Sequence, residues 1–235
     1  MHMIDKHTQR KLPPINSTFR ATGFTLAEIL IALVLNAFIL LALISIFSSN
    51  ISHINKSTNS DTLNQQLESA MQLMANDIRR AGYWGNAQSD VNTGVNNNPF
   101  MTANTDLTIN GGGNCILFSY DYNSDGSAPA ISNAYDDERY GYRVSNQTLQ
   151  ARPPGAAYDC AAGNSAWENV TNPGIVNITN LSFTLNSSTV PVGATTKKLL
   201  IRSVDISITG QLVSDASVTK TLTQHVRILN DKYVP

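Results

Sequence analysis

The feature that most constrains this chain is an apolar run, residues 24–47, whose only polar members are Thr25, Glu28, Asn36 and Ser45. As a helix, this run would be roughly 30 Å or more in length at about 1.5 Å per residue, which is enough to span a bilayer. It is longer than the apolar core of an ordinary secretory signal, and no small-residue cleavage site follows it. The sequence therefore predicts a transmembrane helix joined to one ordinary globular domain, for which 235 residues leave room.

The charges flanking this run predict its orientation. Residues 1–23 carry four Lys or Arg and one Asp, a net charge of +3, and because the whole chain carries −1 the remaining residues carry −4. A basic segment before an apolar run is held in the cytoplasm, so everything after the run is predicted to be exported. The acidic remainder contains no basic stripe, and this argues against direct binding of nucleic acid.

Glu28 is the unusual residue of the apolar run. An ionisable side chain in a membrane span costs several kcal/mol on insertion scales, so its presence indicates a function. The alternative is that the carboxylate extends to the lipid headgroups and has no further role.

The helix is predicted to continue beyond the span, because no Gly or Pro occurs from Phe24 through Ala81. Gly82 supplies a C-terminal stop. Residues 48–61 are rich in Ser and Asn, which are weak helix formers, so we expect a bend or hinge there. The next part has apolar residues at three- and four-residue spacing, a stripe that predicts packing on the sheet of the same domain. The stripe consists of Leu63, Leu67, Ala70, Met71, Met74 and Ile78.

Beyond Gly82 the composition changes. Residues 83–114 are rich in Asn, Gly and Thr, which predicts a long irregular surface segment. The residues after it show period-two alternation of apolar and polar side chains, which is typical of half-buried antiparallel strands. The predicted strands are 115–120, 140–144, 148–152, 175–185, 198–210 and 217–229. One long N-terminal helix packed on an antiparallel sheet predicts an α+β fold.

The stretch GFTLAEILIAL, residues 23–33, resembles the N-terminal signature of type IV pilins and type II secretion pseudopilins. It combines a basic leader, a Gly-Phe junction, a glutamate four residues after the Phe, and an apolar helix. Further motifs are similar to the minor pilin family called PilW, so the resemblance extends along most of the chain. They are DIRRAGYWGN (77–86), CILFSYDYNSDG (115–126), YGYRV (140–144) and YDCAAGNSAWENVT (158–171).

This resemblance implies processing and a division of the chain. A prepilin peptidase would cut between Gly23 and Phe24 and methylate the new N-terminal Phe24. Glu28 would then meet the N-terminus of a neighbouring subunit. The implied segments are a removed leader (1–23), a transmembrane or filament-core helix (24–47), the second half of the long helix (48–82) and a periplasmic α+β domain (83–235).

The resemblance also implies a location and partners. The protein would lie in the bacterial inner membrane with its C-terminal domain in the periplasm, and would then enter a pilus filament or its tip. Its partners would be other minor and major pilins, the prepilin peptidase and the inner-membrane assembly platform, with roles in pilus biogenesis, twitching motility and cell adhesion. Major pilins often have a proline in the apolar helix, and this span has none, which fits a priming or capping subunit better than a bulk subunit.

The two cysteines, Cys115 and Cys160, both lie in the part predicted to be exported. In the oxidising periplasm an even count of two allows one intrachain disulfide. It would close a loop of about 46 residues and contribute up to roughly 4 kcal/mol in the chain-entropy model. The absence of clustered His argues against a zinc site.

The stretch DYNSDG, residues 121–126, has the layout of the first half of a calcium-binding loop, with Asp121, Asn123 and Asp125 as oxygen ligands. The twelfth position is Ser132, where an EF-hand has a glutamate. The acidic run 136–138 could supply a late ligand. The alternative is a turn rich in Asp, Asn and Gly, which needs no metal; calcium is therefore a possible cofactor, and no other cofactor is predicted.

No catalytic motif was found. None of the four His is placed by a motif near a Ser or Cys nucleophile, and the chain has no phosphate-binding loop, no dinucleotide fingerprint and no H-E-x-x-H. We therefore expect a non-enzymatic minor pilin that primes or caps a type IV pilus. The alternatives are a J-like pseudopilin of the type II secretion system and a membrane-anchored periplasmic binding protein or enzyme.

Overall fold

The computed structural model of the protein describes residues 23–89, 97–128, 136–161, 166–193 and 196–234, with side chains at all of these except 52–56 and 89. The predicted leader, apart from Gly23, lies outside the described residues. The chain forms two compact units, Met1–His53 and Ile54–Pro235. The boundary between these units falls inside the Ser- and Asn-rich segment 48–61, and the hinge expected there stays a prediction.

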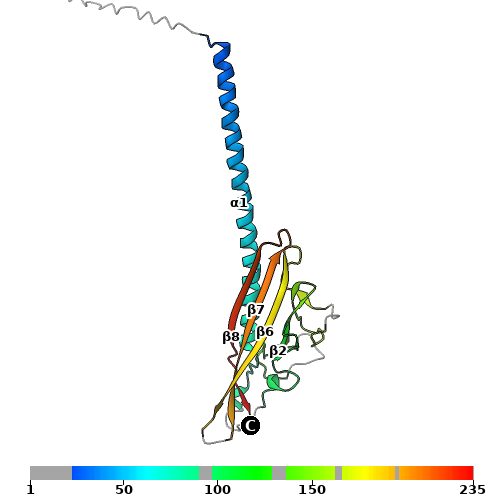
Figure 1. Cartoon of the computed structure of the whole chain (residues 1–235). Helices are drawn as coiled ribbons and strands as arrows, with labels where there is room; N and C mark the ends of the chain where they lie inside the picture. Colours follow the sequence, from blue (N-terminus) through cyan, green and yellow to red (C-terminus); the bar gives the residue numbers. More distant parts are fainter. Residues whose placement is uncertain (1–22, 90–96, 129–135, 162–165, 194–195, 235) are drawn as a thin grey trace, which may run out of the picture. The chain divides into compact units, whose positions relative to one another are not determined.

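One helix, α1 (Leu26–Arg80), contributes to both units (Figure 1). It ends where the sequence predicts, because Gly82 has a positive φ of 74° that L side chains rarely adopt. The backbone N–H of Gly82 donates to the carbonyl oxygen of Ser119 at 2.8 Å. A Cβ at Gly82 would lie 2.3 Å from Cε of Met101, so a larger residue would displace the end of that side chain in addition to straining the backbone.

The second unit also contains two antiparallel sheets (Figure 1). The first sheet has the order β1-β2-β3-β4-β5, and in the second β6 and β8 flank β7, which also pairs with β9. The first sheet consists of β1 (Thr108–Ile109), β2 (Cys115–Ser119), β3 (Arg139–Ser145), β4 (Thr148–Ala151) and β5 (Glu168–Asn169). The second consists of β6 (Val176–Pro191), β7 (Lys198–Leu212), β8 (Thr219–Arg227) and β9 (Lys232–Val234).

The two sheets meet along β6. The backbone N–H of Ile178 donates to the carbonyl oxygen of Gln147 at 2.7 Å, and that of Phe183 donates to Gly113 at 2.7 Å. Both acceptors lie in turns of the first sheet, Gly113 between β1 and β2 and Gln147 between β3 and β4. The second unit is therefore one domain with a common core.

The apolar stripe of α1 forms one wall of this core. All six stripe residues are buried, and they cluster with inward side chains of both sheets such as Phe118, Phe183 and Ile206. The prediction that the stripe packs on the sheet of its own domain is confirmed, and so is the α+β fold.

The remaining differences from the predicted elements have local causes. All six predicted strands are present, and β6 extends beyond residue 185 to Pro191 because β7 pairs with it as far as Lys198. The prediction that 83–114 is an irregular surface segment is partly wrong. Two short 3₁₀ helices, Ala87–Ser89 and Pro99–Met101, lie in it, and Phe100, Met101 and Leu107 are buried.

Candidate functional site

The predicted cleavage junction lies at an open position immediately before α1. Apart from its chain neighbours, no described residue has an atom within 4 Å of a Cβ built on Gly23, and Phe24 is 84% exposed. The described residues therefore leave the peptide bond between these two residues uncovered.

A reciprocal cap begins the helix. Thr25 Oγ1 accepts from the backbone N–H of Glu28 at 3.3 Å, and Glu28 Oε2 accepts from the backbone N–H of Thr25 at 2.8 Å. Oε2 also accepts from the Thr25 hydroxyl at 2.9 Å. This is a capping box, which satisfies two helix N–H groups that have no partner within the helix. Sequence reasoning assigned no role to Thr25, although its T-x-x-E spacing to Glu28 is the usual signal of such a cap.

Glu28 is set in a helical surface that is apolar on every side. The stretch Leu26–Ile51 has a mean hydropathy of 3.0, is not buried within the structure, and is long and apolar enough to cross a membrane. This stretch fits membrane anchoring. It leaves Glu28 with only its own helix terminus as an internal partner among the described residues.

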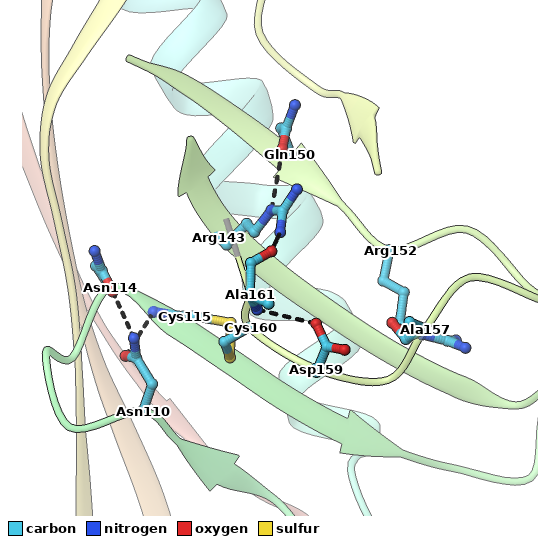
Figure 2. The surroundings of a disulfide bond; sticks show 10 residues. All are labelled: Asn110, Asn114, Cys115, Arg143, Gln150, Arg152, Ala157, Asp159, Cys160 and Ala161. Carbon is cyan, nitrogen blue, oxygen red and sulfur yellow. Dashed lines mark hydrogen bonds between the residues drawn. A yellow bond between two sulfur atoms is a disulfide. The ribbon is translucent and has the colours of Figure 1, made fainter. Parts of the chain in front are cut away.

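The cysteines form a disulfide in the second unit (Figure 2). Cys115 of β2 is bonded to Cys160 with a Cα–Cα distance of 6.0 Å. The bond ties the segment around Cys160 to the face of the first sheet that points away from α1. Leu117 and Trp167 pack beside the disulfide and are buried with Cys115. Gly141 makes room for this packing, because a Cβ there would lie 2.7 Å from Leu117 Cδ2.

Arg143 closes one side of this disulfide cluster (Figure 2). Its guanidinium lies 4.4 Å from the centroid of the Trp167 ring. Its Nε donates to Gln150 Oε1 at 3.1 Å, and its Nη1 donates to the carbonyl oxygen of Ala161. Burial lowers the pKa of Arg143, and the carboxylate of Asp159 partly offsets this. The arginine therefore holds the disulfide-linked segment against the sheet.

A buried ion-pair cluster lies nearby on the same sheet. Asp137 accepts from Arg139 Nε at 2.6 Å, from Arg152 Nη2 at 2.6 Å and from the backbone N–H of Gly155 at 2.8 Å. Burial raises the pKa of Asp137, but these donors outweigh it and hold the pKa below its usual value. Both carboxylate oxygens of Asp137 thus pair with arginines. This argues against the role of late calcium ligand that the sequence suggested for the acidic run 136–138.

Asn123 and Asp125 of the predicted calcium loop take part in turn hydrogen bonds. Asn123 Oδ1 accepts from the backbone N–H of Asp125 at 2.8 Å, and Asp125 Oδ1 accepts from that of Ser127 at 2.7 Å. Asp125 Oδ2 accepts from Asn123 Nδ2 at 3.1 Å. These contacts fit the alternative of a turn stabilised by its own side chains.

Asp121 differs from Asn123 and Asp125 of the predicted calcium loop in its burial and its hydrogen bonds. It is fully buried, and its Oδ2 accepts from the backbone N–H groups of Gly85 at 2.8 Å and Gly126 at 3.0 Å. Its Oδ1 is buried without a hydrogen-bond partner among the described residues. No group of three or more His, Cys, Asp or Glu placed to hold a metal occurs in the described part of the chain. Calcium binding at Asp121, Asn123 and Asp125 stays a prediction.

Glu138 completes the surroundings of this loop. Its Oε1 accepts from the backbone N–H groups of Tyr122 at 2.6 Å and Asn123 at 3.1 Å. Burial raises the pKa of Glu138, and the charges of Asp121 and Asp125 act in the same direction against the two amide donors. Neighbouring residues 137 and 138 therefore have pKa values displaced in opposite directions.

A polar and aromatic cluster joins the end of α1 to the first sheet. Asp77 accepts from the Tyr142 hydroxyl at 2.5 Å and from the Tyr120 hydroxyl at 3.4 Å. The rings of Tyr120 and Tyr140 stack with centroids 4.2 Å apart, and the Arg80 guanidinium lies 4.2 Å from the Tyr120 centroid. Burial is the largest cause that raises the pKa of Tyr140 to about 12. These contacts fix the helix on the sheet.

The structure also pairs His225, which no sequence motif placed near a Ser or Cys nucleophile. Its Nδ1 lies 2.6 Å from Asp205 Oδ1 on the neighbouring strand, and both side chains are more than half exposed. The hydrogen bond from His225 lowers the pKa of Asp205. No serine or cysteine is hydrogen-bonded to His225 within the described ranges, so the pair does not form a nucleophile–base arrangement there.

An apolar N-terminal helix with a glutamate at its start, continued into an α+β domain with one disulfide, defines a pilin-related class of protein. A family model described as prepilin peptidase-dependent protein B matches residues 56–228, which is most of the chain, and the chain belongs to that family. This match lies wholly after the apolar span, so it is independent of the N-terminal motif. The comparisons with curated proteins and with solved structures found no match.

Proposed function

We propose that the chain is a minor pilin, a non-catalytic structural subunit that primes or caps a type IV pilus together with other minor pilins. The observation that carries this proposal is Glu28 at the start of a fully exposed apolar helix in a member of a prepilin peptidase-dependent family. Membership supports a pilin-like or pseudopilin-type subunit. The PilW-like motifs after residue 77 support the pilus among these choices.

In this proposal the prepilin peptidase removes residues 1–23 and methylates Phe24, and the domain that follows the span faces the periplasm. The new α-ammonium lies at the edge of the hydrocarbon, where a carboxylate from another subunit offsets its desolvation. Glu28 offers such a carboxylate, since only its Oε2 takes part in the cap with Thr25. Because an unpaired Glu28 in a membrane costs free energy, this pairing favours assembly.

The proposed partners are other pilins and the inner-membrane assembly platform, and the proposed sites of action are the inner membrane and then the filament or its tip. Twitching motility and cell adhesion would follow from a role in pilus biogenesis. No cofactor is needed for this role.

The test is Glu28→Ala in the full chain, with Glu68→Ala as the matched control. Glu68 is an exposed carboxylate on the same helix, outside the apolar span. We expect Glu28→Ala to abolish pili while the protein level in membranes stays normal, and Glu68→Ala to leave pili unchanged. Normal pili in the Glu28→Ala strain would contradict the proposal.

The second candidate is a J-like pseudopilin, which the family and the N-terminal signature also fit. The same Glu28→Ala strain separates the two candidates. Loss of protein secretion with intact pili would select the pseudopilin. A membrane-anchored binding protein or enzyme would be indifferent to the loss of this carboxylate in both assays.

A further inference from the structure

Asn36 is another polar side chain of the apolar span, and the role proposed for Glu28 does not use it. It lies twelve residues after Phe24, roughly 18 Å along the helix, which is near the middle of a hydrocarbon core about 30 Å thick. Its side chain is exposed, and no hydrogen bond joins its amide to another described residue. An amide without a partner in an apolar medium costs roughly 2–7 kcal/mol, so a partner is expected from outside the chain.

Asn36 shares one face of the helix with a small residue and with the carboxylate. Glu28, Ala32 and Asn36 follow one another at four-residue spacing, which stacks their side chains along one side. They line one shallow hollow on the helix, together with Phe24, Ile29 and Leu33. Small and polar side chains on one face are typical of contacts between membrane helices, because the small residue lets two backbones approach.

We propose that this face binds the same face of a second copy of the chain, with the two helices parallel and in register in the membrane. Removal of the leader would give every copy the same N-terminal end, so two copies place Asn36 at the same depth. A side-chain amide carries both a donor and an acceptor, so the amide N–H of one Asn36 can donate a hydrogen bond to the amide oxygen of the other. This inference rests on the proposed function, because it requires the mature N-terminus.

The charges at the membrane edge agree with such a pair. With a two-fold axis along the membrane normal, the two Glu28 side chains lie at one level and lean toward the two Phe24 α-ammonium groups one helical turn away, so two carboxylates and two ammonium groups share one site. Each charge then has a partner of opposite sign, and the contact is made by the same surface on both copies. Asn36 is a positioning residue here: it fixes the register of the two helices, as a single buried Asn does in coiled coils.

The test uses the full chain in cell membranes, with a new cysteine at one of two positions. Ala32→Cys lies on the proposed face, and Val34→Cys, about 200° around the helix, lies on the other side. The native cysteines are joined to each other and leave the new thiol to react. A mild oxidant should give a covalent dimer, of twice the mass of the chain, at position 32 and little at position 34.

Asn36→Leu is then added to the Ala32→Cys chain. Leucine favours membrane insertion, so a loss of dimer cannot arise from failed insertion. We expect the dimer fraction to fall on the order of fivefold, the effect of one interhelical hydrogen bond, and Asn36→Gln to retain part of it. Equal cross-linking at 32 and 34, an unchanged dimer with Asn36→Leu, or a product whose mass is not twice that of the chain would overturn the proposed second copy.

The mass of the uncross-linked chain separates this inference from the proposed function. A chain that begins at Phe24 and forms no dimer at position 32 overturns the pairing alone. A chain that retains its leader overturns the proposed function, and the pairing with it.

Discussion

The two halves of α1 differ in the exposure of their apolar side chains. From Leu26 to Ile51 the large apolar side chains are exposed on all sides. From Ser57 to Arg80 the stripe is buried against the sheets, and Leu67 and Met74 are fully covered. The same secondary structure therefore has two sources of stability: the second half packs on its own domain, and the first half depends on lipid or on other subunits.

The polar residues of the two regions show the same difference. Asp137 is buried in the domain and is paired with two arginines of the same chain. Asn36 lies in the apolar span and has no hydrogen-bond partner among the described residues. A polar group satisfied within the chain serves stability, whereas the role proposed for Asn36 is in assembly.

The largest expected effect on stability comes from Asp137→Asn. The change leaves Arg139 and Arg152 buried without a carboxylate, so we expect a loss of about 3–5 kcal/mol in the free energy of unfolding. Glu138→Gln is the matched control at the adjacent position, because its amide oxygen can still accept from Tyr122 and Asn123. Urea unfolding of the full chain in detergent should show the loss for residue 137 and none for residue 138. Equal losses of unfolding free energy in the two variants would show that the ion pairs of Asp137 do not stabilise the domain.

The next effect separates the two halves of the helix directly. Met74→Ala leaves a cavity in the core and should lower the free energy of unfolding of the domain by about 2–5 kcal/mol. Leu33→Ala removes an exposed side chain of the span and should leave domain unfolding unchanged. Both values come from the same urea titrations. A large effect of Leu33→Ala on the free energy of unfolding of the domain would contradict this difference between the two halves of α1.

Removal of the disulfide should cost about 2–4 kcal/mol, because the unfolded chain regains the freedom of the loop between Cys115 and Cys160. The variant is Cys115→Ser with Cys160→Ser, measured by thermal unfolding of the full chain. Since the bond lies in the domain, pairing of the apolar spans should persist. Loss of that pairing in the double variant would contradict the independence of the two regions.

The smallest effect is a dependence on pH. The folded pKa of Asp137 is lower than its usual value, so its stabilisation is present above the unfolded pKa, near 3.9, and is lost as the pH falls through the folded pKa. The stability difference between the wild type and Asp137→Asn should therefore shrink below about pH 4. Unfolding titrations at pH 7, 5 and 3 measure it. A difference that grows on acidification would contradict the assignment.

The sequence allowed prediction of the elements whose patterns are long. The stripe from Leu63 to Ile78, the stop at Gly82 and the six longer strands could be predicted because periodicity or glycine geometry marks each of them. Strands of two or three residues, such as β1 and β5, carry no periodicity. The polar end of β6 gave no apolar signal, since its residues are exposed and its extension depends on pairing with β7.

At the candidate site, local signals were again sufficient only in part. The cleavage junction at Gly23 and Phe24 and the assembly role of Glu28 were predicted from a contiguous motif and stay predictions. The pairing of Asp137 with Arg152 and the contact of Arg143 with Trp167 join residues from different strands and loops. Only the fold brings these residues together, so a linear pattern could not predict them.

The most direct test of the account is the N-terminus of the protein in cells with and without the prepilin peptidase. Intact mass and N-terminal sequencing of protein recovered from membranes should give a chain that begins at N-methylated Phe24, and only when the peptidase is present. A chain that begins at Met1 in both kinds of cell would contradict the account, and Glu28 would then need another explanation.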